Sequence, residues 1–200
     1  MTMSIIRSAT DHTNKEISVK RKNNLLLEAR TVLISEAVTP KTTARVVRDL
    51  IILDEISHNP IKIFINSPGG EVNSGFAIFD TIRYIKSEVI IINAGLCASI
   101  ATIINIAVKK ENRLAMPHSM FMIHQPLIHG QVIGPASDLE ITANQILHTR
   151  ARINKLLAKE CGQALNQVEE DTSRDYWMTA DEALKYGLIF KIINSKKEMN

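Results

Sequence analysis

The most constraining feature of this sequence is a nearly continuous apolar run from Val89 to Val108. A run of about 20 apolar residues is long enough to cross a bilayer as a helix. However, Gly95 breaks the middle of the run, and Asn93, Ser99 and Asn105 interrupt it with polar groups. We therefore predict that the run folds as a buried strand, a tight turn and a buried helix, and that the chain does not span a membrane.

Strands and helices are expected to alternate along the rest of the chain. The predicted strands are Thr31–Ile34, Ile61–Ile65, Val89–Ile92 and Met120–Ile123, and the predicted helices are Thr42–Ser57, Asn73–Ile85, Ser99–Val108, a long one from Ser137 to Gly162 and a short one from Thr179 to Gly187. Ser137 with Glu140 and Thr179 with Glu182 have capping-box spacing. This alternation predicts an α/β chain with a mainly parallel sheet.

Four short polar segments follow these predicted elements. They are Ile65-Asn66-Ser67-Pro68-Gly69-Gly70, then Gly95-Leu96-Cys97-Ala98-Ser99, then Met122-Ile123-His124-Gln125-Pro126-Leu127, and finally Asp171-Thr172-Ser173-Arg174-Asp175. Together they offer exposed glycine amides, a serine, a histidine and a carboxylate. These are the groups that serine-nucleophile acyl transfer requires.

Each of these residues also has a purely structural interpretation. Ser99 could be the N-cap of the helix that follows it, and it is not part of a Gly-x-Ser-x-Gly elbow. His124 closes a strand, so its imidazole could reach a cleft, although His118 and His129 lie near the same strand. Two carboxylates, Asp171 and Asp175, could orient an imidazole, so spacing alone leaves the base and its carboxylate open.

The four segments, in this order, resemble the family of the Clp protease proteolytic subunit, ClpP. The resemblance runs from about Arg30 to about Ile193 and includes the Asn-Ser-Pro-Gly-Gly turn, Ala-Ser, Met-Ile-His-Gln-Pro and the late Arg-Asp pair. It implies a ClpP/crotonase-like α/β fold of repeated β-β-α units with a projecting handle at about residues 128–160. The expected organisation is a flexible arm over residues 1–22 and a peptidase domain over residues 23–200.

The resemblance also assigns roles to single residues. It implies a Ser99 nucleophile, a His124 base and, because the family residue follows the arginine, Asp175 as the orienting carboxylate. The remaining implied roles are an oxyanion hole from the backbone N–H groups of Gly70 and Ile100, strand-like substrate binding by Gly70, Glu71, Val72 and Leu127, and partner docking by Phe64. Strand alternation places Phe64 and Lys62 opposite the three isoleucines of Ile61–Ile65, so we expect Phe64 to be exposed.

The family further implies partners. ClpP subunits assemble as stacked seven-membered rings, sometimes with a paralogue, and an AAA+ unfoldase such as ClpX, ClpA or ClpC feeds them unfolded proteins. No cofactor or metal is expected, and no Gly-x-x-x-x-Gly-Lys-Ser/Thr motif suggests a nucleotide site. A net charge of +3 gives no reason to expect nucleic-acid binding, and the basic run Lys20-Arg21-Lys22 is interpreted as a solvated flank.

Two observations bear on the compartment. The N-terminal residues 1–17 have no apolar core of a signal peptide. Cys97 and Cys161 have no metal-binding or redox spacing and suit a reducing compartment. A cytoplasmic location is therefore expected.

Three departures from the family pattern suggest a divergent paralogue. The segment after Pro126 is longer and loses a glycine pair, Ser173 replaces an acidic residue before Arg174, and the family's N-terminal motif is reduced to a basic run. Two other functions therefore stay open: a non-catalytic scaffold subunit of a mixed ring, and an acyl-CoA hydratase or isomerase of the related crotonase architecture. The presence of Ser99, His124 and Asp175 favours the peptidase over both.

Overall fold

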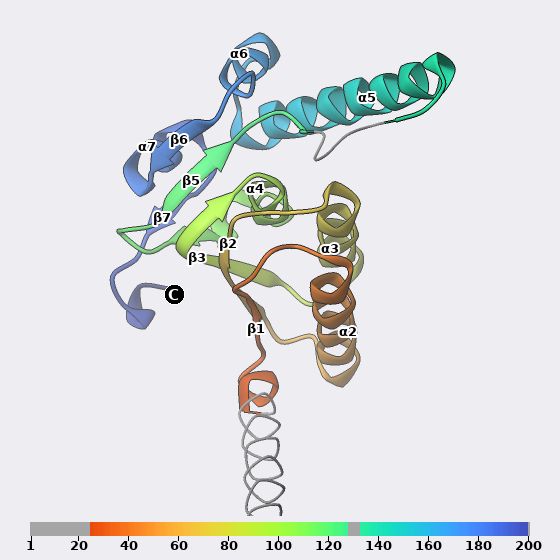
Figure 1. Cartoon of the computed structure of the whole chain (residues 1–200). Helices are drawn as coiled ribbons and strands as arrows, with labels where there is room; N and C mark the ends of the chain where they lie inside the picture. The colour runs from red at the N-terminus through yellow and green to blue at the C-terminus, as the bar shows by residue number, and fades with distance from the viewer. Residues whose placement is uncertain (1–24, 128–132, 200) are drawn as a thin grey trace, which may run out of the picture.

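The computed structural model describes residues 25–127 and 133–199. The predicted arm and the first residues of the predicted handle, with the basic run at Lys20-Arg21-Lys22 and with His129, lie outside the described residues. Figure 1 shows a twisted sheet with helices on both sides and one long helix that extends away from it. Among the described residues, no helix is both long and apolar enough to cross a membrane.

Seven strands form one sheet within the described ranges. They are β1 (Thr31–Ile34), β2 (Ile61–Ser67), β3 (Val89–Ala98), β4 (Arg113–Ala115), β5 (Met120–Ile123), β6 (Tyr176–Thr179) and β7 (Lys191–Ile192). The main order is β1-β2-β3-β4-β7, and β5 pairs with both β3 and β6. Every pairing is parallel except that of β5 with β6, so the prediction of a mainly parallel α/β sheet is confirmed.

Six α-helices have both their ends within the described residues. They are α2 (Pro40–Ile56), α3 (Val72–Tyr84), α4 (Ile100–Asn105), α5 (Ala136–Cys161), α6 (Leu165–Asp171) and α7 (Ala180–Tyr186), with 3-10 turns at Lys110–Asn112 and Lys196–Met199. In Figure 1, α2 and α3 lie side by side on one face, and α5 projects from the body as the predicted handle does.

The predicted strand at 89–92 is too short. Strand β3 runs on through Gly95 to Ala98, and its two halves have different neighbours. Ile91–Asn93 pair with β4, whereas Leu96–Ala98 pair with β5. The glycine therefore bends the strand without ending it, and the sheet continues up to the residue before Ser99.

The two predicted capping boxes had different outcomes. Thr179 and Glu182 form theirs, with side chain and backbone bonded in both directions. The box at Ser137 is wrong, because α5 already begins at Ala136 and its N-cap residue, Pro135, makes no side-chain cap. The Pro135 carbonyl accepts the N–H groups of Asp138 and Leu139, so Ser137 is inside the helix.

The core lies between the sheet and helices α2, α3 and α4. Ile61, Ile63 and Ile65 of β2 are fully buried on that face, as strand alternation predicts. The opposite face of β2 carries Phe64, which packs against a second, smaller cluster built around Ile92. The prediction that Phe64 is exposed is therefore wrong, since its side chain is half-buried there.

Candidate active site

Two ladders bring three distant segments together at one end of the sheet. Ala98 of β3 pairs with Met122 of β5, and the Ser99 N–H donates to the Met122 carbonyl at 2.8 Å. Ile123 of β5 pairs with Tyr176 of β6 in antiparallel register. One further step along the same register brings His124 opposite Asp175.

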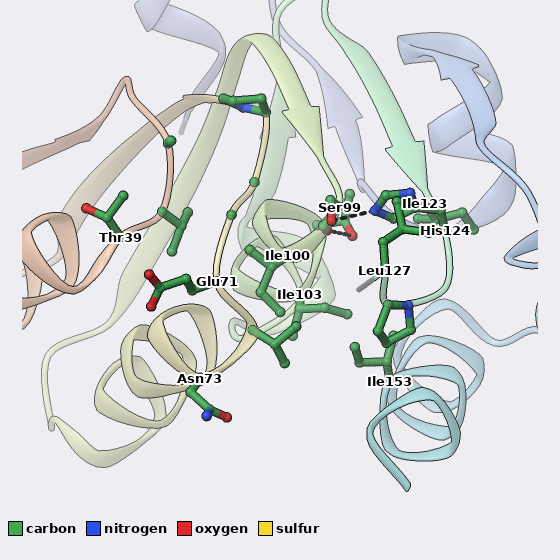
Figure 2. A pocket seen from close by; sticks show the side chains of 18 of the residues that line it. Thr39, Glu71, Asn73, Ser99, Ile100, Ile103, Ile123, His124, Leu127 and Ile153 are labelled. Atoms are coloured by element: carbon green, nitrogen blue, oxygen red, sulfur yellow. Dashed lines mark hydrogen bonds between the residues drawn. The ribbon is translucent and has the colours of Figure 1, made fainter. Parts of the chain in front are cut away.

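Side-chain hydrogen bonds connect the three polar residues in a chain. The distance from Ser99 Oγ to His124 Nε2 is 2.7 Å, and from His124 Nδ1 to Asp175 Oδ1 it is 3.0 Å. Figure 2 shows the serine and the histidine side by side, with a dashed line for the hydrogen bond between them. The structure therefore brings together the three residues that the sequence analysis selected.

The alternative candidates lie elsewhere. Asp171 accepts hydrogen bonds from the hydroxyl of Tyr186 at 2.9 Å and from Gln167 at 2.8 Å, so it fastens α6 to α7. His118 lines a different pocket, beside Phe64. Neither residue contacts the serine. The sequence spacing left the choice of histidine and carboxylate open, whereas the folded chain places His124 and Asp175 beside Ser99.

Ser99 occupies the N-cap position of α4 but does not cap it. Its side chain makes no cap hydrogen bond, and its backbone has φ 55° and ψ −127°. A non-glycine residue at positive φ is uncommon and strained, and such residues cluster at functional sites. The hydroxyl is thus released from the helix and directed at the imidazole.

The glycine turn after β2 packs directly against this serine. A Cβ atom on Gly69 would lie 2.6 Å from the Ala98 carbonyl and 2.8 Å from Ser99 Cβ, and one on Gly70 would lie 2.2 Å from the Val38 carbonyl. A side chain at Gly69 would push the turn away from Ser99, and one at Gly70 would push it away from Val38. The pair Gly69-Gly70 is therefore required by close packing at the site as well as by the turn.

Two backbone N–H groups near the serine remain outside the local hydrogen-bond pattern. Ile100 is the first residue of α4, where a helical N–H has no intrahelical acceptor. The bridge between Val38 and the turn uses the Gly69 carbonyl and the Glu71 N–H, which leaves the Gly70 N–H out of it. These are the two donors that the sequence analysis expected to form an oxyanion hole.

A cleft of about 740 Å³ opens in front of Ser99 and His124. The turn at Gly69–Val72 and Leu127 form part of its lining, and apolar side chains of α4 and α5, namely Ile103, Ile153 and Leu157, form another part. Figure 2 shows Ile153 reaching in from α5, while Glu71 lies on the other side of the cleft. Sequence reasoning did not find the contribution of α5, because Ile153 and Leu157 belong to no motif and only the folded chain brings them to the cleft.

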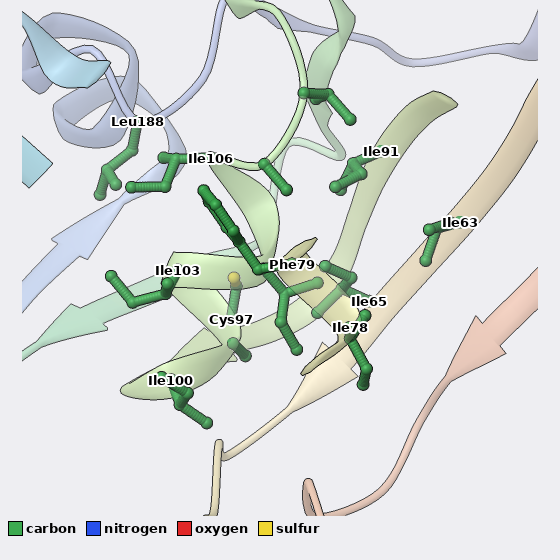
Figure 3. Close-up of a cluster of buried hydrophobic side chains, with 14 of the residues drawn as sticks. Ile63, Ile65, Ile78, Phe79, Ile91, Cys97, Ile100, Ile103, Ile106 and Leu188 are labelled. Atoms are coloured by element: carbon green, nitrogen blue, oxygen red, sulfur yellow. The ribbon is translucent and has the colours of Figure 1, made fainter. Parts of the chain in front are cut away.

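The hydrophobic core continues beneath the cleft. Ile100 and Ile103 of α4, together with Cys97 of β3, belong to the main buried cluster, as Figure 3 shows. Burial raises the pKa of the Cys97 thiol far above its usual range. The described residues contain no group of His, Cys, Asp and Glu side chains that could hold a metal ion.

Comparisons with known proteins agree with this geometry. The family model described as Clp protease matches residues 13–196. The ATP-dependent Clp protease proteolytic subunit 2 of Pseudomonas aeruginosa is 43% identical over 86% of this chain and 85% of its own length, and that of Treponema denticola is 40% identical over 94% and 92%.

A solved structure is also similar. A point mutant of ClpP1 from Listeria monocytogenes superposes with a TM-score of 0.82 at 38% identity, covering 88% of this chain and 98% of that one. The family match spans most of the chain, and the relatives have nearly its full length. The chain therefore belongs to the Clp protease family, as a proteolytic subunit of the ClpP type.

Proposed function

We propose that this chain is a serine endopeptidase subunit that cleaves unfolded polypeptides with Ser99, His124 and Asp175. The observation that carries the proposal is the two-bond chain from Ser99 Oγ through His124 to Asp175, at 2.7 and 3.0 Å. Distances of this size are within the range expected for a nucleophile, its base and the group that orients the base. A scaffold subunit would have no need of this arrangement.

In the proposed first step, Ser99 Oγ attacks the peptide carbonyl while His124 Nε2 takes the hydroxyl proton. Asp175 accepts the Nδ1–H, which fixes the imidazole tautomer and stabilises the imidazolium. The imidazolium then returns the proton to the leaving amine. Water enters, gives its proton to the same imidazole and hydrolyses the acyl-enzyme, which restores the Ser99 hydroxyl.

The negative oxygen of the tetrahedral intermediate needs preorganised donors. The N–H groups of Gly70 and Ile100 fit this role, because neither is used in the bridge or in the helix. Backbone donors survive a change of side chain, so isoleucine at position 100 serves as well as another residue. Removing one such donor typically costs about 10²–10³ in turnover.

The substrate is proposed to bind as an added strand between the Gly70–Val72 edge and Leu127. Main-chain pairing of this kind provides affinity with little dependence on side-chain sequence. The apolar side chains of Ile103, Ile153 and Leu157 line the same cleft and would receive one apolar substrate residue near the cleaved bond. Unfolded proteins supply both extended backbone and apolar side chains.

The catalytic subunit is proposed to work in stacked seven-membered rings in the cytoplasm, with an AAA+ unfoldase as partner. Phe64 and Lys62 line a pocket of about 530 Å³ together with Ile92, Met116 and Met199. This pocket is the proposed docking place for an apolar side chain of the unfoldase. A half-buried aromatic ring in such a pocket offers apolar area without complete exposure.

We also propose that the isolated chain forms active double rings poorly and needs a paralogous ring or an unfoldase. Ser173 lacks the carboxylate that could pair with an arginine across a ring interface, and the segment leading into the handle is longer than in the family. One surface ion pair contributes only about 0–1 kcal/mol, but a ring repeats the loss at every subunit. Sedimentation of the purified chain tests this, and stable, fully active tetradecamers without a partner would refute it.

Labelling with a fluorophosphonate probe tests the central assignment. The probe should modify Ser99, identified by peptide mass, and should abolish peptide hydrolysis. Ser99→Ala should assemble normally, remain unlabelled and lose at least about 10⁴-fold in turnover. Full activity of purified Ser99→Ala rings would exclude Ser99 as the nucleophile, and an unlabelled, inactive parent chain would favour the scaffold.

A further inference from the structure

A buried polar contact connects the handle helix to the segments that carry the histidine and the carboxylate. The Thr172 hydroxyl lies 3.1 Å from Asn154 Oδ1 on α5 and 2.8 Å from the Val168 carbonyl on α6. Thr172 is 0% and Asn154 1% exposed. Polar side chains buried this deeply are costly unless they are hydrogen-bonded, so the pair has a defined geometry.

Thr172 also holds the residue next to the histidine. Its carbonyl accepts the backbone N–H of Gln125 at 2.7 Å, and the Gln125 side chain donates to the Ser173 carbonyl at 2.8 Å. Two hydrogen bonds therefore join the chain just after His124 to the chain just before Asp175. These bonds extend the β5–β6 pairing beyond the last ladder pair, Ile123 with Tyr176.

We propose that Asn154 and Thr172 are positioning residues for His124 and Asp175, acting through the hydrogen bonds that join Gln125 to Thr172 and Ser173. The proposal rests on the proposed peptidase function and goes beyond it, because neither residue touches the reacting groups. The Asn154 side chain holds Thr172, and the Thr172 carbonyl holds the backbone of Gln125. His124 directly precedes Gln125, so the position of its imidazole depends on these two contacts.

The chemistry of the pair supports a geometric role over a purely stabilising one. The Thr172 hydroxyl has a single proton, which the Val168 carbonyl accepts at 2.8 Å; turning the Asn154 amide over then lets Nδ2 donate to the same hydroxyl, so that no buried N–H is left unpaired. Replacing both partners of such a bond by apolar groups of the same shape costs little stability, so packing alone does not require the pair. What an apolar pair cannot supply is a directional bond that fixes the rotation of the Thr172 side chain and of the loop behind it.

Neighbouring residues on α5 reach the cleft itself. Ile153 and Leu157 line the cleft, and Asn154, between them in sequence, points to Thr172. A shift of α5 would therefore move the cleft wall and the anchor of the histidine segment at the same time. Displacements near 1 Å can cost about 10²-fold in rate without any change of the reacting groups.

The test uses assembled full-length chains with a fluorogenic peptide. Thr172→Val removes the hydroxyl and keeps the shape, and we expect a fall in kcat of about 10–100-fold with KM within about twofold. Thr172→Ser restores the hydroxyl and should recover most of kcat. The rate of fluorophosphonate reaction with Ser99 should fall in parallel with kcat, since it depends on the same imidazole.

The double variant Asn154→Leu/Thr172→Val separates positioning from stability. Its melting temperature should stay close to that of the parent, because both polar partners are replaced together, but its kcat should remain low. Ser87→Ala is the matched control, since Ser87 is a buried hydroxyl that donates to Asp54 far along the chain from the site. It should lower the melting temperature and leave kcat unchanged.

Two results would overturn the proposal. One is a kcat of Thr172→Val rings equal to that of the parent. The other is a double variant in which both the melting temperature and kcat return to the parental values. Both differ from failure of the proposed function itself, which would appear as undiminished hydrolysis by Ser99→Ala. An inactive Ser99→Ala with a fully active Thr172→Val would leave the triad in place and remove the positioning role.

Discussion

The cleft at Ser99 lies beside the glycine turn that follows β2, and the pocket at Phe64 lies on the face of β2 opposite the main core. The two are built by different means. The cleft depends on polar atoms held at 2.7 and 3.0 Å by strand register and by glycines that allow no side chain. The pocket is bounded by apolar side chains of β2, β3 and the C-terminal turn, and Phe64 is only half-buried in it. Catalysis requires fixed directions between atoms, whereas docking requires accessible apolar area, so substitutions should affect the two regions very differently.

The largest expected difference concerns Asp171 and Asp175, the two carboxylates that spacing alone left open as partners of the imidazole. Asp175→Asn should lower turnover about 10⁴-fold, because an amide at this position favours the wrong imidazole tautomer. Asp171→Asn should cost far less in turnover, because Asp171 bonds to Tyr186 and Gln167 and has no contact with His124. Steady-state peptidase assays on the two assembled variants give the comparison directly, and a reversed order would show that the carboxylate has been misassigned.

The glycine turn allows a test of how closely the cleft must be packed. Gly69→Ala would place a methyl group 2.6 Å from the Ala98 carbonyl, so the turn must move away from Ser99 and take the Gly70 N–H with it. Turnover should fall by about 10²-fold or more, the effect of losing an oxyanion donor.

Gly162→Ala is the control for backbone strain. Gly162 has φ +71°, yet a Cβ there would meet nothing within 4 Å. Like Gly69→Ala, this variant places a side chain at a positive-φ position, which should lower the free energy of unfolding by about 1–2 kcal/mol. Its turnover should stay unchanged. Equal losses of turnover in both variants would show that strain alone, and not the position of the turn, explains the result.

The elements carrying strong local signals could be predicted from sequence. Strand β1 over Thr31–Ile34 and strand β5 over Met120–Ile123 were predicted with their observed bounds, and the long helix was predicted to stop near Gly162, which is the C-cap residue after its last residue, Cys161. Apolar alternation and a left-handed glycine are local properties, so they can be recognised before the chain is folded. The family resemblance, in turn, selected His124 and Asp175 where spacing alone did not.

The elements that depend on distant partners could not be predicted. Strands β4 and β7 have only three and two residues, and β6 becomes a strand because β5 lies beside it. The contact between Asn154 and Thr172 joins two helices through residues with no shared motif. Phe64 is half-buried because it packs against a cluster that includes Leu114 and Ile193, which are far away in sequence and which no period along β2 reveals.

Phe64→Ala should have a smaller and more selective effect than the substitutions in the cleft. Unfoldase-driven degradation of a folded substrate should fall by about tenfold, since truncating an aromatic anchor typically weakens docking by more than about 1 kcal/mol. Hydrolysis of a short peptide, which needs no unfoldase, should change much less. Tyr84→Ala is the control, because Tyr84 is an aromatic residue that is 85% exposed at the end of α3 and lines neither hollow.

The outcomes of this comparison are distinct. Unchanged unfoldase-driven degradation by Phe64→Ala would remove the docking role. Equal losses for the peptide and for the folded substrate would mean that the substitution disturbs the second cluster around Ile92 and, through β3, the catalytic end of the sheet. Only a loss confined to the unfoldase-driven reaction supports separate catalytic and docking regions.

The smallest expected effect concerns the thiol of Cys97, two residues before Ser99. Cys97 is fully buried, pairs with Ser67 and Phe121 in the sheet, and has a thiol whose pKa is raised by burial. Burial likewise raises the pKa of Cys161 to about 12. A raised pKa keeps a thiol protonated at about pH 7–9, and the neutral thiol is a poor nucleophile.

Iodoacetamide should therefore neither label these cysteines in the folded chain nor reduce peptidase activity, whereas both should react in guanidinium chloride. Rapid labelling of Cys97 with loss of activity, at a pH where the fold is intact, would show that the sheet opens beneath Ser99 and that the cleft is less rigid than its hydrogen bonds imply.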